Sequence, residues 1–105
     1  MTEKILKVVV FVPATHADGI RDVLQKIGAG KTKKYEGCSF SMPDLQSFRS
    51  RKGAGSFAGK VEEERIETFI PSSLKKLLLN KIKEVHPYEK PVIDFYKIES
   101  SYTPV

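Results

Sequence analysis

The segment His86-Pro87-Tyr88-Glu89 places an imidazole, a phenol and a carboxylate within four residues. These groups could coordinate a metal or hold a polar ligand at a turn between a helix and a strand. They equally suit a structural role, in which the prolines stiffen the turn, Tyr88 packs and Glu89 bonds backbone amides. We favour the structural interpretation, because turns are rich in proline and polar anchors for conformational reasons. A metal needs three or more converging ligands and His16 is the only other histidine, so no metal site and no cofactor are predicted.

The single cysteine, Cys38, lies beside Ser39 in a strand-like segment. One cysteine excludes an intrachain disulfide and a zinc site built from cysteines. A catalytic thiol would need a lowered pKa and a nearby base, which Tyr35 or His86 could supply only if the fold brought it close. A buried cysteine that acts as a small apolar residue is the simpler interpretation. We therefore name no catalytic residue and lean against an enzyme.

Three consecutive carboxylates, Glu62, Glu63 and Glu64, could serve acid–base chemistry or bind Mg²⁺. If the segment is a strand, alternation sends Glu62 and Glu64 to one face and Glu63 to the other. A charge pattern on an edge strand, which blocks aggregation or pairs across an interface, explains the three residues more simply.

After the segment His86-Pro87-Tyr88-Glu89, two groups of basic residues are the strongest candidates for a binding site. They would make a cationic cleft for a phosphate-bearing ligand if the central loop folded near the end of the first helix. A solvated loop is the simpler interpretation, and Gly53-Ala54-Gly55 is no P-loop because it precedes a strand rather than a helix. The basic residues concerned are Lys31, Lys33, Lys34, Arg49, Arg51 and Lys52.

Six elements must position these residues. Apolar periodicity and breakers predict strands over residues 5–12, 37–42, 60–70 and 92–98, and helices over residues 15–27 and 72–85. The first strand is apolar throughout, as expected for a central strand. The order β, α, β, β, α, β predicts an α+β ferredoxin-like sandwich, with an antiparallel sheet and two helices on one face. The uncovered face would then need solvent-tolerant residues or another subunit.

Local signals predict where the helices begin and end. Thr15 is a candidate N-cap of the first helix, and Ser72 or Ser73 of the second. Gly28-Ala29-Gly30 supplies the end of the first helix, because glycine enters the left-handed region at little cost. His86-Pro87 ends the second helix, since a residue before proline disfavours the helical conformation.

We predict one domain over residues 1–105, with a core at about 4–98, a long loop at about 43–59 that begins at Pro43, and a polar tail at 99–105. A composition of 40% hydrophobic and 30% charged residues is typical of a soluble globular protein. The apolar run near the start is too short to span a membrane and no cleavage site follows it, which predicts a cytoplasmic location. A net charge of +5 favours anionic partners, but no nucleic-acid-binding motif accompanies it.

Several of these segments together resemble a known domain across residues 5–98. It is the PII-like or CutA-like domain that is inserted in many bacterial members of the Nif-three-like family and also occurs alone. The final part, Tyr88-Glu-x-Pro91, also resembles the C-terminal motif of CutA proteins. The segments that carry the resemblance are Phe11-Val12-Pro13, His16, Gly28-Ala29-Gly30, Tyr35, Cys38-Ser39-Phe40, Phe57-x-Gly59, Glu63-Glu64-Arg65-Ile66-Glu67 and His86-Pro87-Tyr88-Glu89-x-Pro91-x-x-Asp94.

The resemblance implies a ferredoxin-like fold and trimers that assemble through sheet edges, with ligand clefts between subunits as in PII proteins. It does not imply the dinuclear metal centre of the Nif-three-like family, which belongs to flanking domains. The central loop lacks the family's Gly-rich spacing.

The resulting hypothesis is a non-catalytic, homo-oligomeric module, most simply a trimer, that binds a small anion or a protein partner. The alternative is a divalent-metal-binding protein or small metal-dependent enzyme that uses His86 and Glu89. The candidate ligand-binding residues are Tyr35, Cys38, Ser39, Arg49, His86, Tyr88 and Glu89.

Overall fold

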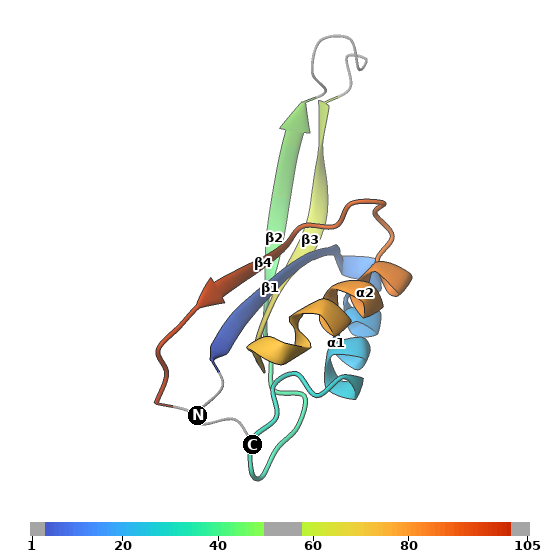
Figure 1. Cartoon of the computed structure of the whole chain (residues 1–105). Helices are drawn as coiled ribbons and strands as arrows, with labels where there is room; N and C mark the ends of the chain where they lie inside the picture. The colour runs from blue at the N-terminus through green and yellow to red at the C-terminus, as the bar shows by residue number, and fades with distance from the viewer. Residues whose placement is uncertain (1–3, 50–57, 102–105) are drawn as a thin grey trace.

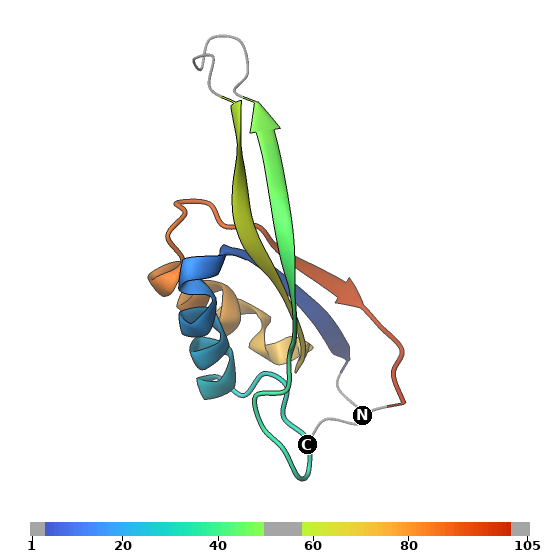
Figure 2. The ribbon, with the colours of Figure 1, turned by 180° about the vertical axis from the view of Figure 1, so that it is seen from behind.

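The fold has the predicted element order. The computed structural model describes residues 4–49 and 58–101. Its elements are β1 (Ile5–Pro13), the 3₁₀ turn η1 (Ala14–His16), α1 (Ala17–Lys26), β2 (Phe40–Arg49), β3 (Ala58–Pro71), the 3₁₀ turn η2 (Ser72–Leu74), α2 (Lys75–Val85) and β4 (Ile93–Lys97). The sheet has the order β2-β3-β1-β4, and all neighbours are antiparallel. Both helices lie on one side of it (Figures 1 and 2), so the ferredoxin-like prediction is confirmed.

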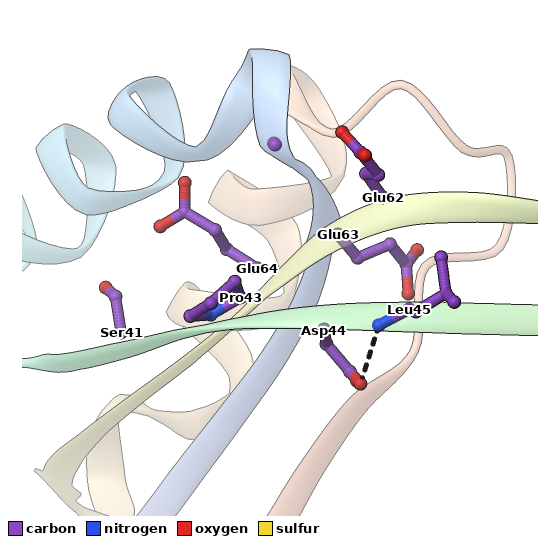
Figure 3. A pocket seen from close by; sticks show the side chains of 8 residues that line it. Ser41, Pro43, Asp44, Leu45, Glu62, Glu63 and Glu64 are labelled. Carbon is purple, nitrogen blue, oxygen red and sulfur yellow. Dashed lines mark hydrogen bonds between the residues drawn. The ribbon is translucent and has the colours of Figure 1, made fainter.

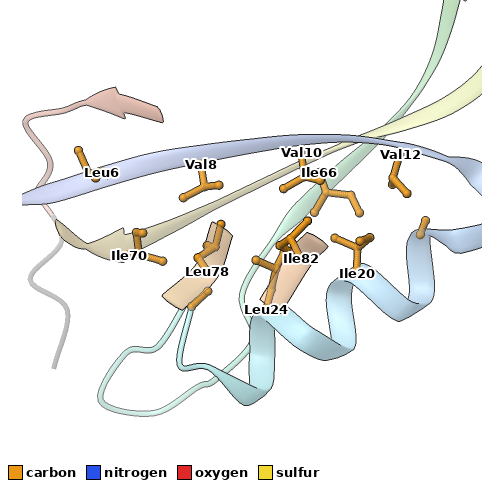
Figure 4. Close-up of a cluster of buried hydrophobic side chains, with 12 residues drawn as sticks. Leu6, Val8, Val10, Val12, Ile20, Leu24, Ile66, Ile70, Leu78 and Ile82 are labelled. Atoms are coloured by element: carbon orange, nitrogen blue, oxygen red, sulfur yellow. The ribbon is translucent and has the colours of Figure 1, made fainter. Parts of the chain in front are cut away.

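The core lies between the sheet and the two helices (Figure 4). Alternate residues of β1 and β3 point toward the helices, because successive side chains of a strand lie on opposite faces. The amphipathic stripes of α1 and α2 meet them, and removal of this apolar surface from water stabilises the layer. Apart from two alanines, the buried members are Leu6, Val8, Val10, Val12, Ile20, Leu24, Ile66, Ile70, Leu78 and Ile82.

The strands β2 and β3 extend beyond the rest of the sheet. The pairing of β1 with β3 ends at Pro13 opposite Glu63. Residues 58–62 of β3 therefore pair only with residues 45–49 of β2. This two-stranded extension rises past the helices (Figure 1). A two-stranded ribbon is marginally stable by itself, so its faces favour further contacts.

Pro43 does not end the second strand, and this prediction was wrong. It lies within β2, opposite Glu64. The strand continues because β2 is at the sheet edge, where a residue without an N–H is tolerated. The predicted loop over 43–59 is therefore strand at both ends, and residues 50–57 lie outside the described residues. The edge-strand explanation fails for Glu63 and Glu64, because β3 pairs with both β1 and β2 at these residues, whereas Glu62 pairs with β2 alone. The suggested pairing of these glutamates across an interface stays a prediction.

The helix starts differ from prediction, whereas the ends agree. The N-cap of α1 is His16 and that of α2 is Leu74, and neither helix has a side-chain cap hydrogen bond. A 3₁₀ turn precedes each helix, and the predicted caps fall within these turns. Gly28 and Gly30 have φ angles of 93° and 66°, as the predicted helix end requires. His86 is extended and ends α2 before Pro87.

No helix in residues 4–49 or 58–101 is long and apolar enough to cross a membrane.

Candidate functional site

His86 joins the end of α2 to β1. Its Nδ1 accepts a hydrogen bond from the Tyr88 backbone N–H at 3.1 Å, so Nε2 carries the ring proton and donates to the Phe11 carbonyl at 2.8 Å. The residue is only 7% exposed. A metal at His86 would have to displace one of these two bonds. The contacts therefore support the structural interpretation of this histidine.

Tyr88 turns its phenol toward β3. Its hydroxyl donates to Glu63 Oε2 at 3.2 Å, and its ring centroid lies 5.0 Å from that of His86. Burial raises the pKa of Tyr88, and the hydrogen bond and charge of Glu63 raise it further. Glu89 is exposed, and no hydrogen bond or ion pair joins it to another described residue. The segment thus provides one engaged imidazole, one engaged phenol and one solvated carboxylate.

Two hollows lie on opposite faces of the β2–β3 ribbon near its base. The first, of about 340 Å³, is on the face away from the helices, beside Tyr88 and Glu63. The second, of about 670 Å³, is an open hollow on the helix side (Figure 3). Its lining includes all three glutamates, Glu62, Glu63 and Glu64, and Arg21 forms an ion pair with Glu64 at 2.8 Å. The side chain of Glu63 points away from those of Glu62 and Glu64 (Figure 3), as the predicted alternation requires.

Cys38 lies at a different part of the sheet from His86. Its backbone N–H donates to the Gly30 carbonyl at 3.0 Å, and its carbonyl accepts the Thr68 hydroxyl at 2.7 Å. Thr68 is opposite Val8, three residues along β1 from the carbonyl that holds His86. That separation is about 10 Å along the strand. Within one chain, the fold does not bring His86 to Cys38.

The neighbours of Cys38 form a separate group. Cys38 and Ser39 are partly buried, whereas Tyr35 is 68% exposed in the preceding turn. A small hollow of about 190 Å³ borders Cys38, Phe40 and Thr68. The seven predicted ligand-binding residues are therefore dispersed over the chain rather than gathered in one pocket.

Among the described residues, the two groups of the predicted cationic cleft do not come together. Lys31, Lys33 and Lys34 precede the start of β2, whereas Arg49 is its last residue. The nine residue steps from Phe40 to Arg49 span about 30 Å, so the two groups lie at opposite ends of the strand. Arg51 and Lys52 lie outside the described residues.

The part of the chain that the structure describes contains no group of three or more His, Cys, Asp or Glu residues that could hold a metal.

The sequence-based list of candidate ligand-binding residues did not include Glu63. Its signal was the alternation itself, which separates Glu63 from both adjacent glutamates.

The Tyr88 phenol is expected to titrate above its ordinary value near 10, because burial and Glu63 both disfavour the phenolate. Since the folded pKa is raised, this contribution to stability is complete below about pH 10 and is lost as the pH rises through the folded value. Ultraviolet titration of tyrosinate in the wild type and in Tyr88→Phe measures it. Glu63→Gln should move the Tyr88 titration to lower pH, and an unchanged curve would contradict the contact.

The amino-acid sequence is similar to part of several longer bacterial proteins. The chain is 37% identical over 103 residues to the GTP cyclohydrolase 1 type 2 homolog of Halalkalibacterium halodurans, covering 92% of this chain and 28% of that protein. It is 34% identical over 106 residues to the protein of that name from Bacillus subtilis, covering 95% and 28%. The chain thus spans about 28% of the length of these relatives. No family model matches it.

The structure is also similar to solved structures, one of which is a NIF3-related protein. A Bacillus cereus protein related to NIF3 superposes with a TM-score of 0.88 and 38% identity, covering 98% of this chain and 28% of that one. The periplasmic divalent cation tolerance protein CutA from Archaeoglobus fulgidus superposes with a TM-score of 0.72 and 17% identity, covering 92% and 86%. At that identity the CutA likeness shows the fold alone. The chain therefore has a CutA-like fold and is similar to one segment, about 28% of the length, of a NIF3-related protein.

Proposed function

We propose that the chain is a homo-oligomeric PII/CutA-like binding module of the cytoplasm, with a trimer as its assembled form. The observation that carries the proposal is the sheet face that no helix covers. Phe40, Met42 and Phe48 of β2 lie on this open face with Tyr96 of β4, because they pair with residues that alternate away from the core. Their exposed fractions are 79%, 51%, 38% and 48%.

Large apolar side chains that gather on one face typically mark an interaction surface. The β2–β3 ribbon adds length to this face beyond β1, where no other described strand supports it. A second copy packed on the open face would remove both features from water at once. The CutA-like fold and the resemblance to domains that form trimers favour three copies.

Binding rather than catalysis is the role that the described contacts favour. The imidazole of His86 is engaged at both nitrogens, and the thiol of Cys38 is remote from it. The activity suggested by the names of the longer relatives belongs to proteins of which this chain matches 28%. We therefore assign this segment an assembly and ligand-binding role.

Light scattering coupled to gel filtration is expected to give a mass near three times 11.8 kDa for the wild type. Met42→Glu should shift the protein toward the monomer, because it places a charge on the open face. Leu77→Glu is the matched control, since Leu77 is 41% exposed on α2 at the covered side. A wild type that elutes as a monomer at micromolar concentration would contradict the proposal, and circular dichroism checks that both variants are folded.

A further inference from the structure

The carboxylates of β3 differ in what neutralises them. Glu64 pairs with Arg21 at 2.8 Å, and Glu67 pairs with Arg65 at 2.8 Å. Glu63 is 3% exposed, yet no lysine or arginine in residues 4–48 or 59–101 forms an ion pair with it. A carboxylate removed from water without a cation is costly, so this position calls for an explanation.

The hydrogen bonds of Glu63 leave acceptor capacity unused. Oε2 accepts the Tyr88 hydroxyl at 3.2 Å, and no donor from a described residue reaches Oε1. All fully enclosed side-chain oxygens and nitrogens of the described residues have partners, so Oε1 must be reachable from outside. A carboxylate can accept about four hydrogen bonds. Glu63 is therefore buried and retains acceptor capacity for an incoming donor.

Glu63 lines the hollow of about 340 Å³ on the open face. The volume of this hollow is at the lower end of the range for small-molecule pockets, which begins at about 300 Å³. Two aromatic rings and one aliphatic side chain form its apolar walls, and the polar groups come from β2, β3 and the turn before β4. The other lining residues are Phe11, Asp44, Gln46, Tyr88, Lys90 and Val92.

A second carboxylate faces the same hollow. Asp44 is directly opposite Glu63 in the β2–β3 pairing, and like charges in that position repel. One oxygen of Asp44 accepts the Leu45 backbone N–H at 2.8 Å, which leaves the other for a ligand. A cation between the two carboxylates would turn this repulsion into attraction.

We propose that this hollow binds a small organic cation, whose guanidinium or ammonium group lies between the carboxylates of Glu63 and Asp44. The aromatic ring of Tyr88 suits such a group, because cations are attracted to ring faces. The Phe11 ring also lines the hollow, but the Arg65 guanidinium already lies over it, 5.7 Å from its centroid. Two carboxylates alone are a poor site for an inorganic ion, which needs three or more converging ligands. The lining residues all come from one chain, and the hollow lies on the same open face that the proposed assembly would use.

Lys90 is the internal competitor for the site. It lines the hollow and is exposed, and it forms no ion pair with a described carboxylate. Its ammonium group weakens the field that an incoming cation would meet. Removal of Lys90 should therefore tighten binding of a cation. If Lys90 were instead a structural partner of Glu63, its removal would destabilise the fold.

The proposal is tested with methylguanidinium at low millimolar concentration, with methylurea as its neutral isostere and sodium chloride to match ionic strength. Amide chemical shifts of the full chain report binding, and the residues of the hollow should respond to methylguanidinium alone. Glu63→Gln should weaken binding at least about tenfold, because it removes the charge and keeps the shape. Glu62→Gln, one residue away on the opposite face, should leave affinity unchanged, and Lys90→Ala should increase it about twofold or more.

Equal responses to methylguanidinium and methylurea would overturn the proposal, as would no response at all. It would also be overturned if Glu63→Gln dissociated an oligomer while methylguanidinium caused no change, because a side chain of a second copy would then be the cation. If Glu63→Gln perturbs the fold, Asp44→Asn provides the second variant, and an unchanged affinity in that variant contradicts the site.

Discussion

Replacement of Gly30 by alanine is expected to destabilise the fold by about 3 kcal/mol or more and to lower the melting temperature by more than about 10 °C. Gly30 has a φ angle of +66°, which costs an L side chain strain energy. A Cβ at this position would overlap the Cys38 carbonyl oxygen and lie 2.7 Å from the Cys38 amide nitrogen. The obstacle is backbone, which cannot rotate away as a side chain can.

The same residue connects two parts of the sheet. The Gly30 N–H donates to the Phe69 carbonyl at 2.9 Å, and its own carbonyl accepts the Cys38 N–H at 3.0 Å. A shift at Gly30 therefore loosens the approach to β2, and the Cys38 thiol should react faster with a thiol reagent in Gly30→Ala.

Gly19→Ala is the matched control for this experiment. Gly19 lies in α1, and a Cβ there would meet nothing within 4 Å beyond the backbone of its own helix. Alanine at this position should therefore stabilise the helix by about 0.5–1 kcal/mol. Thermal and urea unfolding measure both variants. Equal melting temperatures for Gly30→Ala and the wild type would contradict the close approach to Cys38.

The fold could be predicted because its main signals are local. The continuous apolar run predicts a buried strand for β1, and the apolar residues three and four apart predict a helix with one buried face for α1. The structure buries most of β1 and the apolar face of α1. Gly30 and Pro87 act at helix ends through backbone geometry alone. These rules need no knowledge of distant neighbours, which is why the element order and the covered face followed from the sequence.

The length of β2 could not be predicted, because it depends on where the strand lies in the sheet. Pro43 breaks an interior strand but is tolerated at an edge, and only the pairing order shows which applies. The predictions of Thr15 and of Ser72 or Ser73 as helix N-caps were wrong for a similar reason. A three-residue 3₁₀ turn follows Pro13 and another follows Pro71, so α1 begins at Ala17 rather than at residue 15 and α2 at Lys75 rather than at residue 72.

The candidate site divides in the same way. The structural role of His86 was predicted from its place in a proline-bounded turn, and its contacts agree. The importance of Glu63 depends on Tyr88 and Asp44, which are 25 and 19 residues away along the chain. No local sequence pattern shows that a carboxylate will lack an ion-pair partner, because its neighbours in space are set only by the folded structure.

His86→Ala is expected to destabilise the fold by about 2–4 kcal/mol. The change removes the imidazole from a site that is 7% exposed and leaves the Phe11 carbonyl and the Tyr88 N–H without their described partners. The turn that carries Tyr88 should then move away from β1, so the amides of residues 87–92 should exchange faster with solvent. Unfolding in urea and hydrogen exchange measure the two effects.

Conservative variants separate the two bonds of His86. The amide nitrogen of glutamine lies near the position of Nε2 and can donate to Phe11, whereas the amide oxygen of asparagine lies near Nδ1 and can accept from Tyr88. Each variant should therefore recover part of the stability that alanine loses. His16→Ala is the control, because His16 is exposed and, among the described residues, its ring forms a hydrogen bond with Thr15 alone.

The same series distinguishes a structural histidine from a metal ligand. A structural His86 predicts that divalent metals leave the wild-type melting temperature unchanged and that glutamine and asparagine rescue stability without metal. A metal ligand predicts the reverse, since Zn²⁺ or Cu²⁺ would raise the wild-type melting temperature and the rise would vanish in His86→Gln. Because both ring nitrogens already hold backbone groups, we expect the first result. A metal-dependent rise that disappears with His86 would show that the imidazole leaves one of these bonds, and the structural role would then be wrong.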